Sequence, residues 1–252
     1  MAANGTQAVD RAALLISTVV QADEPLSFAD LQEACDLPKS TTSRMLTALE
    51  RSELLERRDD GSYVAGSLFW LYAARHDPGE DLVRLATPTL AAIGEETHET
   101  VNLSVARADR VLQVAQVDSR FILGSRDWTQ IDVPAHCSSL GKVFLAWDVV
   151  TLPDGPLDRP TDSTVCDRAV LRAELARSRR RGWATTVDEL EVGLSGIAVP
   201  VFGPRGQVVG AVGVSGPTPR VQVRFDEVGP LLREHAAELT ELLRGKTPEE
   251  AA

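Results

Sequence analysis

The stretch SFADLQEACDLPKSTTSRMLTALERSELL, residues 27–55, predicts two short helices separated by a tight turn. The first helix runs from Ser27 to Cys35. Asp30 follows Ser27 at the spacing of a capping box, in which each side chain accepts a hydrogen bond from the backbone N–H of the other residue. Pro38 separates the two helices, because a proline disfavours helical geometry at the residue before it.

The second helix, from about Lys39 to Arg51, has two different faces. Four residues at helical spacing form the face that we expect to be buried: Thr42, Met45, Leu46 and Leu49. The opposite face is rich in hydroxyls and cations and carries no carboxylate: Lys39, Ser40, Thr41, Ser43, Arg44 and Thr47. Such a helix start suits DNA phosphates and base edges in a major groove. An ordinary pair of core helices is the alternative that this pattern also fits.

A basic hairpin is expected directly after the helix pair. Two short extended segments flank an Asp60-Gly61 turn, and Arg57 and Arg58 lie beside that turn. A helix pair followed by such a hairpin is the pattern of a winged helix-turn-helix. We therefore predict a double-stranded DNA operator as partner. The predicted DNA-binding residues are Ser40, Thr41, Ser43 and Arg44 on the bases and Lys39, Arg57 and Arg58 on phosphates.

The charge of the chain argues against tight DNA binding by a single copy. The whole chain carries 26 basic and 37 acidic residues, for a net charge of −11. Residues 1–75 hold 7 basic and 11 acidic residues, so this part is also acidic. Phosphate neutralisation supplies most of the affinity of sequence-independent DNA binders. We expect useful affinity only when two or more such domains bind one operator.

Length and composition indicate a globular protein with one large domain or two ordinary ones. The chain has 252 residues, of which 43% are hydrophobic, enough for a sizeable core. Its three cysteines, Cys35, Cys137 and Cys166, lack metal or disulfide spacing, so a reducing cytoplasm is the expected setting. No apolar run approaches the roughly 20 residues of a membrane helix. We therefore predict no membrane partner, and we interpret residues 12–20 as a core helix.

A third helix, from Gly66 to Arg75, is expected to link two domains. It carries five large apolar side chains: Leu68, Phe69, Trp70, Leu71 and Tyr72. The sequence His76-Asp77-Pro78-Gly79 then ends it. These side chains fit packing against a partner copy and burial against their own domain equally well. We predict a winged helix-turn-helix domain at 1–65, a linker helix at 66–79 and an effector-binding domain at 80–252.

The third part of the chain predicts a mixed α/β (α+β) domain, a sheet with helices packed on it. Helices are expected at 81–94, 139–147 and 166–181 and after residue 225, and strands at 101–105, 111–117, 121–123, 183–187, 194–202 and 207–214. The strand at 101–105 alternates as if half-buried. Arg179, Arg180 and Arg181 are interpreted as a solvated helix end, because cations complement the dipole there.

Three sequence runs, in order, resemble the IclR family of bacterial transcription regulators. They are VPAHCSSLGKVFLA at 133–146, residues 181–189 followed by GLSGIAVPV at 193–201, and VGVSGP at 212–217 with Arg220. With the winged helix and the linker helix, the resemblance covers nearly the full chain. It implies a GAF-like effector domain, a homodimer or dimer of dimers, and regulation by a small organic or aromatic acid.

The loop from His136 to Gly141 is the expected effector site. Backbone N–H groups at 138–141 would point outward at the start of a helix and suit a carboxylate. Thr186 and Gly196 stand where some family members carry Asp and Cys, which predicts a roomier pocket and an aromatic or longer acid. The predicted effector-binding residues are Ile122, Trp128, Val133, Ser138, Ser139, Leu140, Thr186, Ser195 and Gly196. The alternative is a tight strand-to-helix junction without a ligand.

An enzyme is not predicted. His136 beside Cys137 invites a thiol nucleophile, but adjacent loop residues seldom point at each other, and no third orienting group is identifiable. The four histidines lack metal-ligand spacing, so neither a metal nor a cofactor is expected. The alternative function is a GAF-like small-molecule-binding module whose output is protein contact or thiol hydrolysis.

Overall fold

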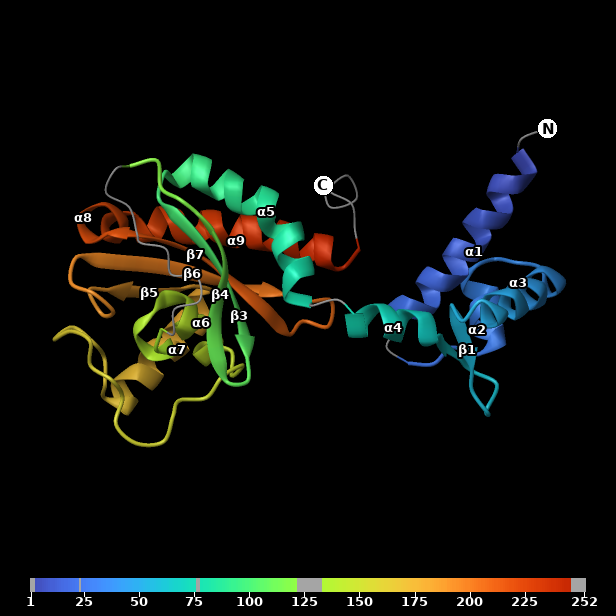
Figure 1. Ribbon diagram of the computed structural model, residues 1–252, viewed down its shortest axis with the longest axis horizontal. Coiled ribbons are helices and arrows are strands. Elements are labelled where there is room, and N and C mark those ends of the chain that lie inside the picture. The colour runs from blue at the N-terminus through green and yellow to red at the C-terminus, as the bar shows by residue number, and fades with distance from the viewer. Residues whose placement is uncertain (1–2, 23, 76–77, 122–132, 246–252) are drawn as a thin grey trace. The chain divides into compact units, whose positions relative to one another are not determined.

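The computed structural model describes residues 3–22, 24–75, 78–121 and 133–245. The chain divides into two compact units, Met1–Pro78 and Gly79–Ala252 (Figure 1). The predicted strand at 121–123 falls mostly outside the described residues, as does the predicted loop around Trp128. None of the described helices combines the length and the apolar character that a membrane span requires.

The first unit is a helix-turn-helix with a two-stranded wing. Its elements are α1 (Ala3–Gln21), α2 (Phe28–Ala34), α3 (Lys39–Arg51), β1 (Leu55–Arg57), β2 (Tyr63–Ala65) and α4 (Ser67–Arg75). Strands β1 and β2 pair antiparallel. The core gathers one apolar face from each of α1, α2 and α3 with Leu55 and Tyr63. In α1 the buried positions are Leu15 and Val19, whereas Leu14, within the segment that we interpreted as a core helix, is 45% exposed.

Local sequence signals explain how the helix pair begins and ends. Ser27 Oγ accepts a hydrogen bond from Asp30 N–H at 3.2 Å, and Asp30 Oδ2 accepts one from Ser27 N–H at 2.8 Å, so the predicted capping box is confirmed. The predicted bounds of α3 are also confirmed. Thr42, Leu46 and Leu49 are buried on its inner side, as expected.

The second unit is built on an antiparallel sheet. Among the described residues the strand order is β4-β3-β7-β6-β5. The strands are β3 (Thr100–Arg107), β4 (Arg110–Val117), β5 (Ala184–Val187), β6 (Leu194–Phe202) and β7 (Val208–Pro217). The helical elements are α5 (Pro78–Thr97), η1 (Ala135–Cys137), α6 (Ser139–Ala146), α7 (Arg168–Arg181), α8 (Thr218–Val221), η2 (Gln222–Arg224) and α9 (Phe225–Leu243).

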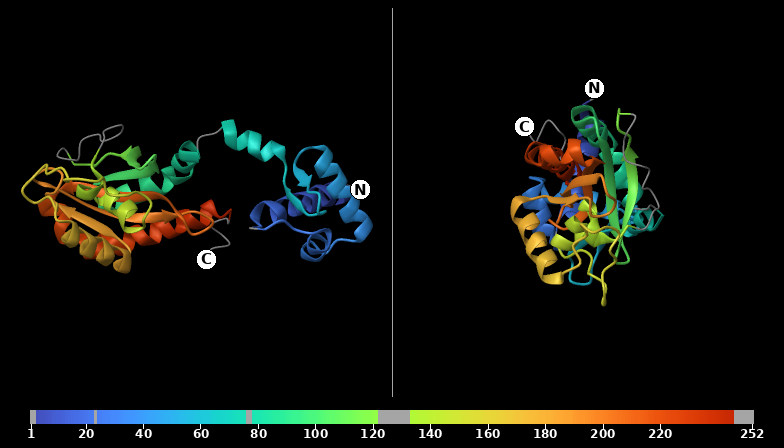
Figure 2. Two further views of the ribbon diagram at one scale, coloured as in Figure 1. Left: turned by 90° about the horizontal axis from the view of Figure 1, so that it is seen from below. Right: turned by 90° about the vertical axis from the view of Figure 1, so that its left-hand side faces the viewer.

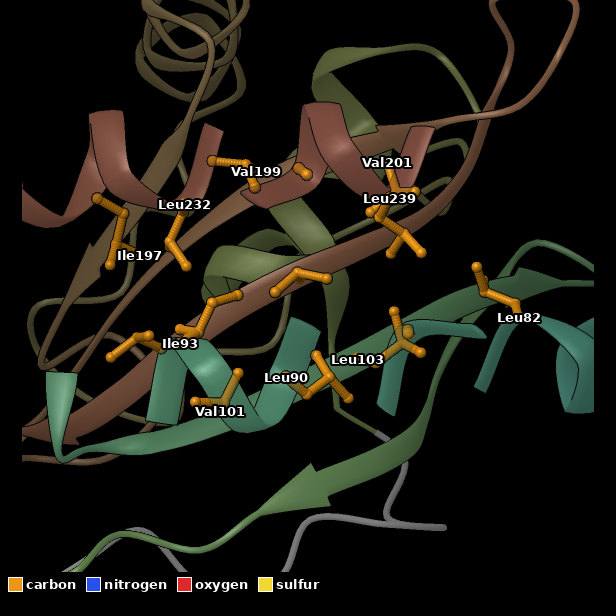
Figure 3. Packing of buried hydrophobic residues seen from close by; sticks show 14 of the residues in the cluster. Leu82, Leu90, Ile93, Val101, Leu103, Ile197, Val199, Val201, Leu232 and Leu239 are labelled. Carbon is orange, nitrogen blue, oxygen red and sulfur yellow. The ribbon is translucent and has the colours of Figure 1, made fainter. Parts of the chain in front are cut away.

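Helices cover both faces of this sheet. In the end-on view of Figure 2, α5 and α9 lie on one face and α6 and α7 on the other. The alternation of β6 explains this, because successive side chains of a strand point to opposite faces. Val199 packs into the core under α5 and α9 with Leu90 and Leu232 (Figure 3), whereas Ala198 packs into the core under α6 and α7. The predicted α+β class is confirmed.

Several predicted boundaries were wrong. Helix α7 begins two residues later than expected, because the Asp167 carboxylate caps it by accepting hydrogen bonds from the N–H groups of Ala169 and Val170. Helix α5 runs on both sides of the expected range and continues through Pro88. Strand β7 extends three residues further, to Pro217, because it pairs with the start of β6 at Leu194.

Candidate functional site

The outer face of α3 presents the predicted DNA-binding residues together. Lys39, Ser40, Ser43 and Arg44 are exposed and Thr41 is half-buried. Thr42 lies between them on the inner side, where its hydroxyl donates a hydrogen bond to the carbonyl of Pro38 at 3.2 Å. Within the part of the chain that the structure describes, neither Lys39 nor Arg44 forms an ion pair. Both cations are therefore available to an anionic partner.

The wing holds its two arginines differently. Arg58 and Arg57 are both exposed, but the Arg57 guanidinium lies over the Tyr63 ring, 5.9 Å from its centre. Asp60 fixes the turn by accepting hydrogen bonds from the N–H and hydroxyl of Ser62 at 2.9 and 2.6 Å, which lowers the pKa of this carboxyl group. Arg57 is thus supported on the flank of the wing, a role for Tyr63 that the sequence did not reveal.

The second unit contains a pocket at the start of α6. It encloses about 590 Å³ of space free of atoms, including solvent at its mouth. Seven predicted effector residues line it: Val133, Ser138, Ser139, Leu140, Thr186, Ser195 and Gly196. Ile122 and Trp128 lie outside the described residues. Among the described residues, those that line it include no charged side chain, so they would meet a charged ligand through dipoles.

The floor of the pocket is a polar surface that the sequence did not reveal. The further lining residues are Asn102, Ser104, Val111, Gln113, Cys137, Leu190, Leu194 and Ser215. Gln113 Nε2 donates to Asn102 Oδ1 at 2.7 Å, and Asn102 Nδ2 donates to Ser215 Oγ at 3.0 Å. We had expected the strand at 101–105 to be half-buried, but Asn102 and Ser104 are 2% and 1% exposed, because β3 is an inner strand covered by helices on both faces.

The first turn of α6 offers two backbone donors to this pocket. Ser138 is the N-cap, and its hydroxyl accepts a hydrogen bond from Gly141 N–H at 3.0 Å. The expectation that the Gly141 N–H is available was therefore wrong. The N–H groups of Ser139 and Leu140 have no partner among the described residues, and the positive end of the helix dipole adds to them. A carboxylate fits this position.

Gly196 lies where α6 approaches β6 closely. A Cβ atom at this position would lie 2.8 Å from Ser139 Oγ and 3.5 Å from Thr186 Oγ1. Part of the room that we expected from the missing side chain is thus occupied by the Ser139 hydroxyl. The Ser139 hydroxyl from α6 and the Thr186 hydroxyl from β5 therefore face the backbone of β6 at Gly196, and together they form a polar wall.

Cys137 is not placed as a nucleophile. Its side chain is fully buried, and its Sγ donates to the carbonyl of Pro134 at 3.4 Å. Burial raises the pKa of this thiol to about 12, so it stays protonated at neutral pH. The neighbouring His136 is engaged elsewhere, since its Nε2 lies 2.8 Å from the carbonyl oxygen of Asp158. Among the described residues, no group of three or more His, Cys, Asp or Glu side chains is gathered as a metal site would be.

A buried ion cluster holds the pocket walls in place. Lys142, in α6, has no exposed surface, and its Nζ donates to both Glu189 carboxylate oxygens at 2.6 and 2.8 Å and to Glu174 Oε1 at 2.7 Å. Glu174 belongs to α7, and Glu189 precedes Leu190, which lines the pocket. Burial raises the pKa of Glu189, an effect that Lys142 opposes.

Comparison with known proteins identifies the family. The family model of the IclR helix-turn-helix domain matches residues 8–59, and that of the C-terminal domain of bacterial IclR transcriptional regulators matches residues 78–241. This chain belongs to the IclR family of bacterial transcriptional regulators. The predicted resemblance is thereby confirmed. Helix α3 lies within the first match and the pocket within the second, whereas β2 and α4 lie outside both.

Relatives within the IclR family cover nearly the full chain. The transcriptional repressor AllR of Salmonella typhi is 27% identical over 260 residues, covering 98% of this chain and 93% of AllR. A putative IclR regulator from Silicibacter has a TM-score of 0.72 at 27% identity, covering 96% and 98% of the two chains. An IclR homolog from Microbacterium hydrocarbonoxydans, complexed with 4-hydroxybenzoate, has a TM-score of 0.60 at 24% identity, covering 95% and 100%. At 24% identity, the likeness to the Microbacterium protein shows a shared fold and no more.

Proposed function

We propose that this IclR family member is a cytoplasmic transcriptional repressor whose affinity for operator DNA is regulated by a small organic acid. The observation that carries the proposal is the pocket at the start of α6, which combines free backbone donors with a polar floor. The relatives named as repressors support the direction of control. The buried, protonated Cys137 speaks against the thiol-hydrolase alternative.

On DNA, α3 supplies the sequence-reading contacts. Ser40, Thr41, Ser43 and Arg44 contact base edges from its exposed face, since hydroxyls and a guanidinium fork match groups in the major groove. Lys39, Arg57 and Arg58 contact phosphates and set the position of the helix. The stacking of Arg57 on Tyr63 supports a fixed place for this cation on the wing.

The effector is an aromatic or longer acid with a polar group opposite its carboxylate. The carboxylate accepts hydrogen bonds from the N–H groups of Ser139 and Leu140. Asn102 and Gln113, on the floor, meet the polar end through amide groups that both donate and accept. An IclR homolog complexed with 4-hydroxybenzoate supports this class, because that acid has a carboxylate and a hydroxyl at opposite ends of one ring.

The protein works as a homodimer or a dimer of dimers, and α4 carries the contact. Leu68, Trp70 and Leu71 are 46%, 73% and 39% exposed, so α4 does not bury them against its own unit. Exposed apolar groups of this size on one short helix are typical of a protein interface. Pairing two copies also compensates for the low DNA affinity expected of one acidic DNA-binding unit, because two recognition helices then bind one operator.

Footprinting on the DNA upstream of its own gene tests the proposal, with and without 4-hydroxybenzoate, benzoate and short aliphatic acids. We expect protection of paired half-sites that an aromatic acid changes. Calorimetry on the same acids, with Leu140→Pro removing one backbone donor in the first turn of α6, where no intrahelical hydrogen bond is lost, links the response to the pocket. No acid bound in calorimetry, together with protection that no acid alters, would contradict the proposal.

A further inference from the structure

A second pocket lies at the far ends of α6 and α7 and shares no lining residue with the effector pocket. Four arginines line it: Arg179, Arg180 and Arg181 at the end of α7, and Arg233 from α9. Trp147 and Phe202 form an aromatic part of its wall. It encloses about 790 Å³ of space free of atoms, including solvent. Its described lining includes no carboxylate, in a chain whose net charge is −11.

Two of the four guanidinium groups are held in place. Arg179 donates to the Asp148 carboxylate at 2.6 Å and to the Ala146 carbonyl at 3.1 Å. Arg181 donates to the Trp183 carbonyl at 2.7 Å and to the Thr185 hydroxyl at 2.8 Å. These bonds orient the two groups at the edge of the pocket. The well-exposed Asp148 carboxylate neutralises the charge of Arg179.

The other two guanidinium groups are available to a ligand. Arg180 and Arg233 are exposed and have neither a hydrogen bond nor an ion pair among the described residues. Helix-end electrostatics explains cations at 179–181, but it does not explain Arg233, which comes from another helix. Gly182 lets Arg233 lie close to the end of α7, because a Cβ at this left-handed position (φ 92°) would lie 2.9 Å from Arg233 Nε.

We propose that this pocket binds an organic polyphosphate that carries a planar ring, such as a nucleoside triphosphate. Guanidinium groups match phosphate oxygens with two parallel hydrogen bonds and stay charged at all relevant pH values. Trp147 and Phe202 meet edge to face, with ring centres 6.4 Å apart and planes at 68°, and provide a surface for the ring. The site is additional to the effector pocket and to the proposed function.

Calorimetry on the full chain with ATP and with inorganic triphosphate, at physiological salt and without divalent cations, tests the proposal. We expect one ATP per chain, and Arg180→Ala/Arg233→Ala to weaken it at least about tenfold, since each removed hydrogen bond is to a charged group. The matched control is Arg159→Ala/Arg172→Ala, which removes the same charge from exposed positions outside the pocket and should leave affinity within about twofold. Trp147→Leu should reduce ATP binding to the level of triphosphate.

Several outcomes would overturn the proposal. One is the absence of ATP binding to the parent chain, and another is an equal loss in both double variants. Triphosphate binding as tightly as ATP would remove the ring from the ligand and with it the proposed class. If the Arg180→Ala/Arg233→Ala variant instead lost operator DNA, the pocket would be a DNA contact. Unchanged 4-hydroxybenzoate binding in that variant keeps this test separate from the effector pocket.

Discussion

Lys142 is the residue whose removal should be most costly, because its buried ammonium donates hydrogen bonds to two carboxylates, those of Glu174 and Glu189. Breaking a buried ion pair by removing one partner typically costs about 3–5 kcal/mol. We expect Lys142→Met to lower the free energy of unfolding of the second unit by about that amount in urea titrations. Lys39→Met, at an exposed lysine, is the control. A loss below about 1 kcal/mol would mean that the cluster contributes little to stability.

The same cluster predicts a dependence of stability on pH. Burial raises the pKa of Glu189 in the folded protein. The folded state therefore holds this proton to higher pH than the unfolded chain does. The contribution of this proton to the stability of the folded state is complete below the ordinary glutamate pKa of about 4.3. It is lost as pH rises through the raised pKa of Glu189. Glu189→Gln should remove this part of the slope of unfolding free energy against pH. An unchanged slope would mean that another group causes this pH dependence.

Gly196 permits a third test at the scale of single residues. In Gly196→Ala the new methyl group would meet the Ser139 hydroxyl at 2.8 Å, so this hydroxyl must rotate and the polar wall narrows. We expect 4-hydroxybenzoate to bind about three- to tenfold more weakly in calorimetry, the effect of one disturbed hydrogen bond. Stability should change by less than about 1 kcal/mol, because only a rotatable group gives way. Unchanged affinity would exclude this wall from ligand contact.

Among the elements, α3 carries the clearest prediction for DNA. Arg44→Ala should relax sequence preference and cost about 1–3 kcal/mol on the preferred operator. Arg58→Ala should weaken all sequences alike and reduce the salt slope by about one. Binding titrations at several salt concentrations on operator and unrelated DNA distinguish the two roles. Arg51→Ala, in the last turn of the same helix, is the control. An equal loss on every sequence for Arg44→Ala would make Arg44 a phosphate contact.

Elements whose signals are local could be predicted from the sequence, and those that depend on distant cover could not. The capping box of Ser27 and the bounds of α3 follow from neighbouring residues, and the structure agrees. The burial of Asn102 depends on distant segments, because β7 pairs with β3 and Ser215, more than 100 residues later in the chain, accepts a hydrogen bond from Asn102 Nδ2. A polar residue in an alternating strand gives no sign of such cover, so the polar floor of the pocket was missed.

At the scale of the whole molecule, the exposed side chains of α4 predict assembly. Trp70→Glu should shift sedimentation of the chain to the monomer, because a charge in an apolar contact must be buried without a partner. Paired half-site protection in footprints should disappear with it. Val192→Glu, at another well-exposed apolar position, is the control and should leave both measurements unchanged. A Trp70→Glu chain that still sediments as an oligomer would place the interface elsewhere.

Helix α6 is short, at eight residues or about 12 Å, and each of its ends meets a different pocket. The start of α6 is closely packed, since a Cβ at Gly141 would lie 2.3 Å from the Ala135 carbonyl oxygen. The ion pair of Lys142 with Glu174 anchors α6 to α7. Trp147, directly after the last residue of α6, lines the second pocket, the one with four arginines. A helix held so firmly moves as one body. Whatever factor an acid at one end imposes on polyphosphate affinity at the other, the polyphosphate must impose the same factor on the acid.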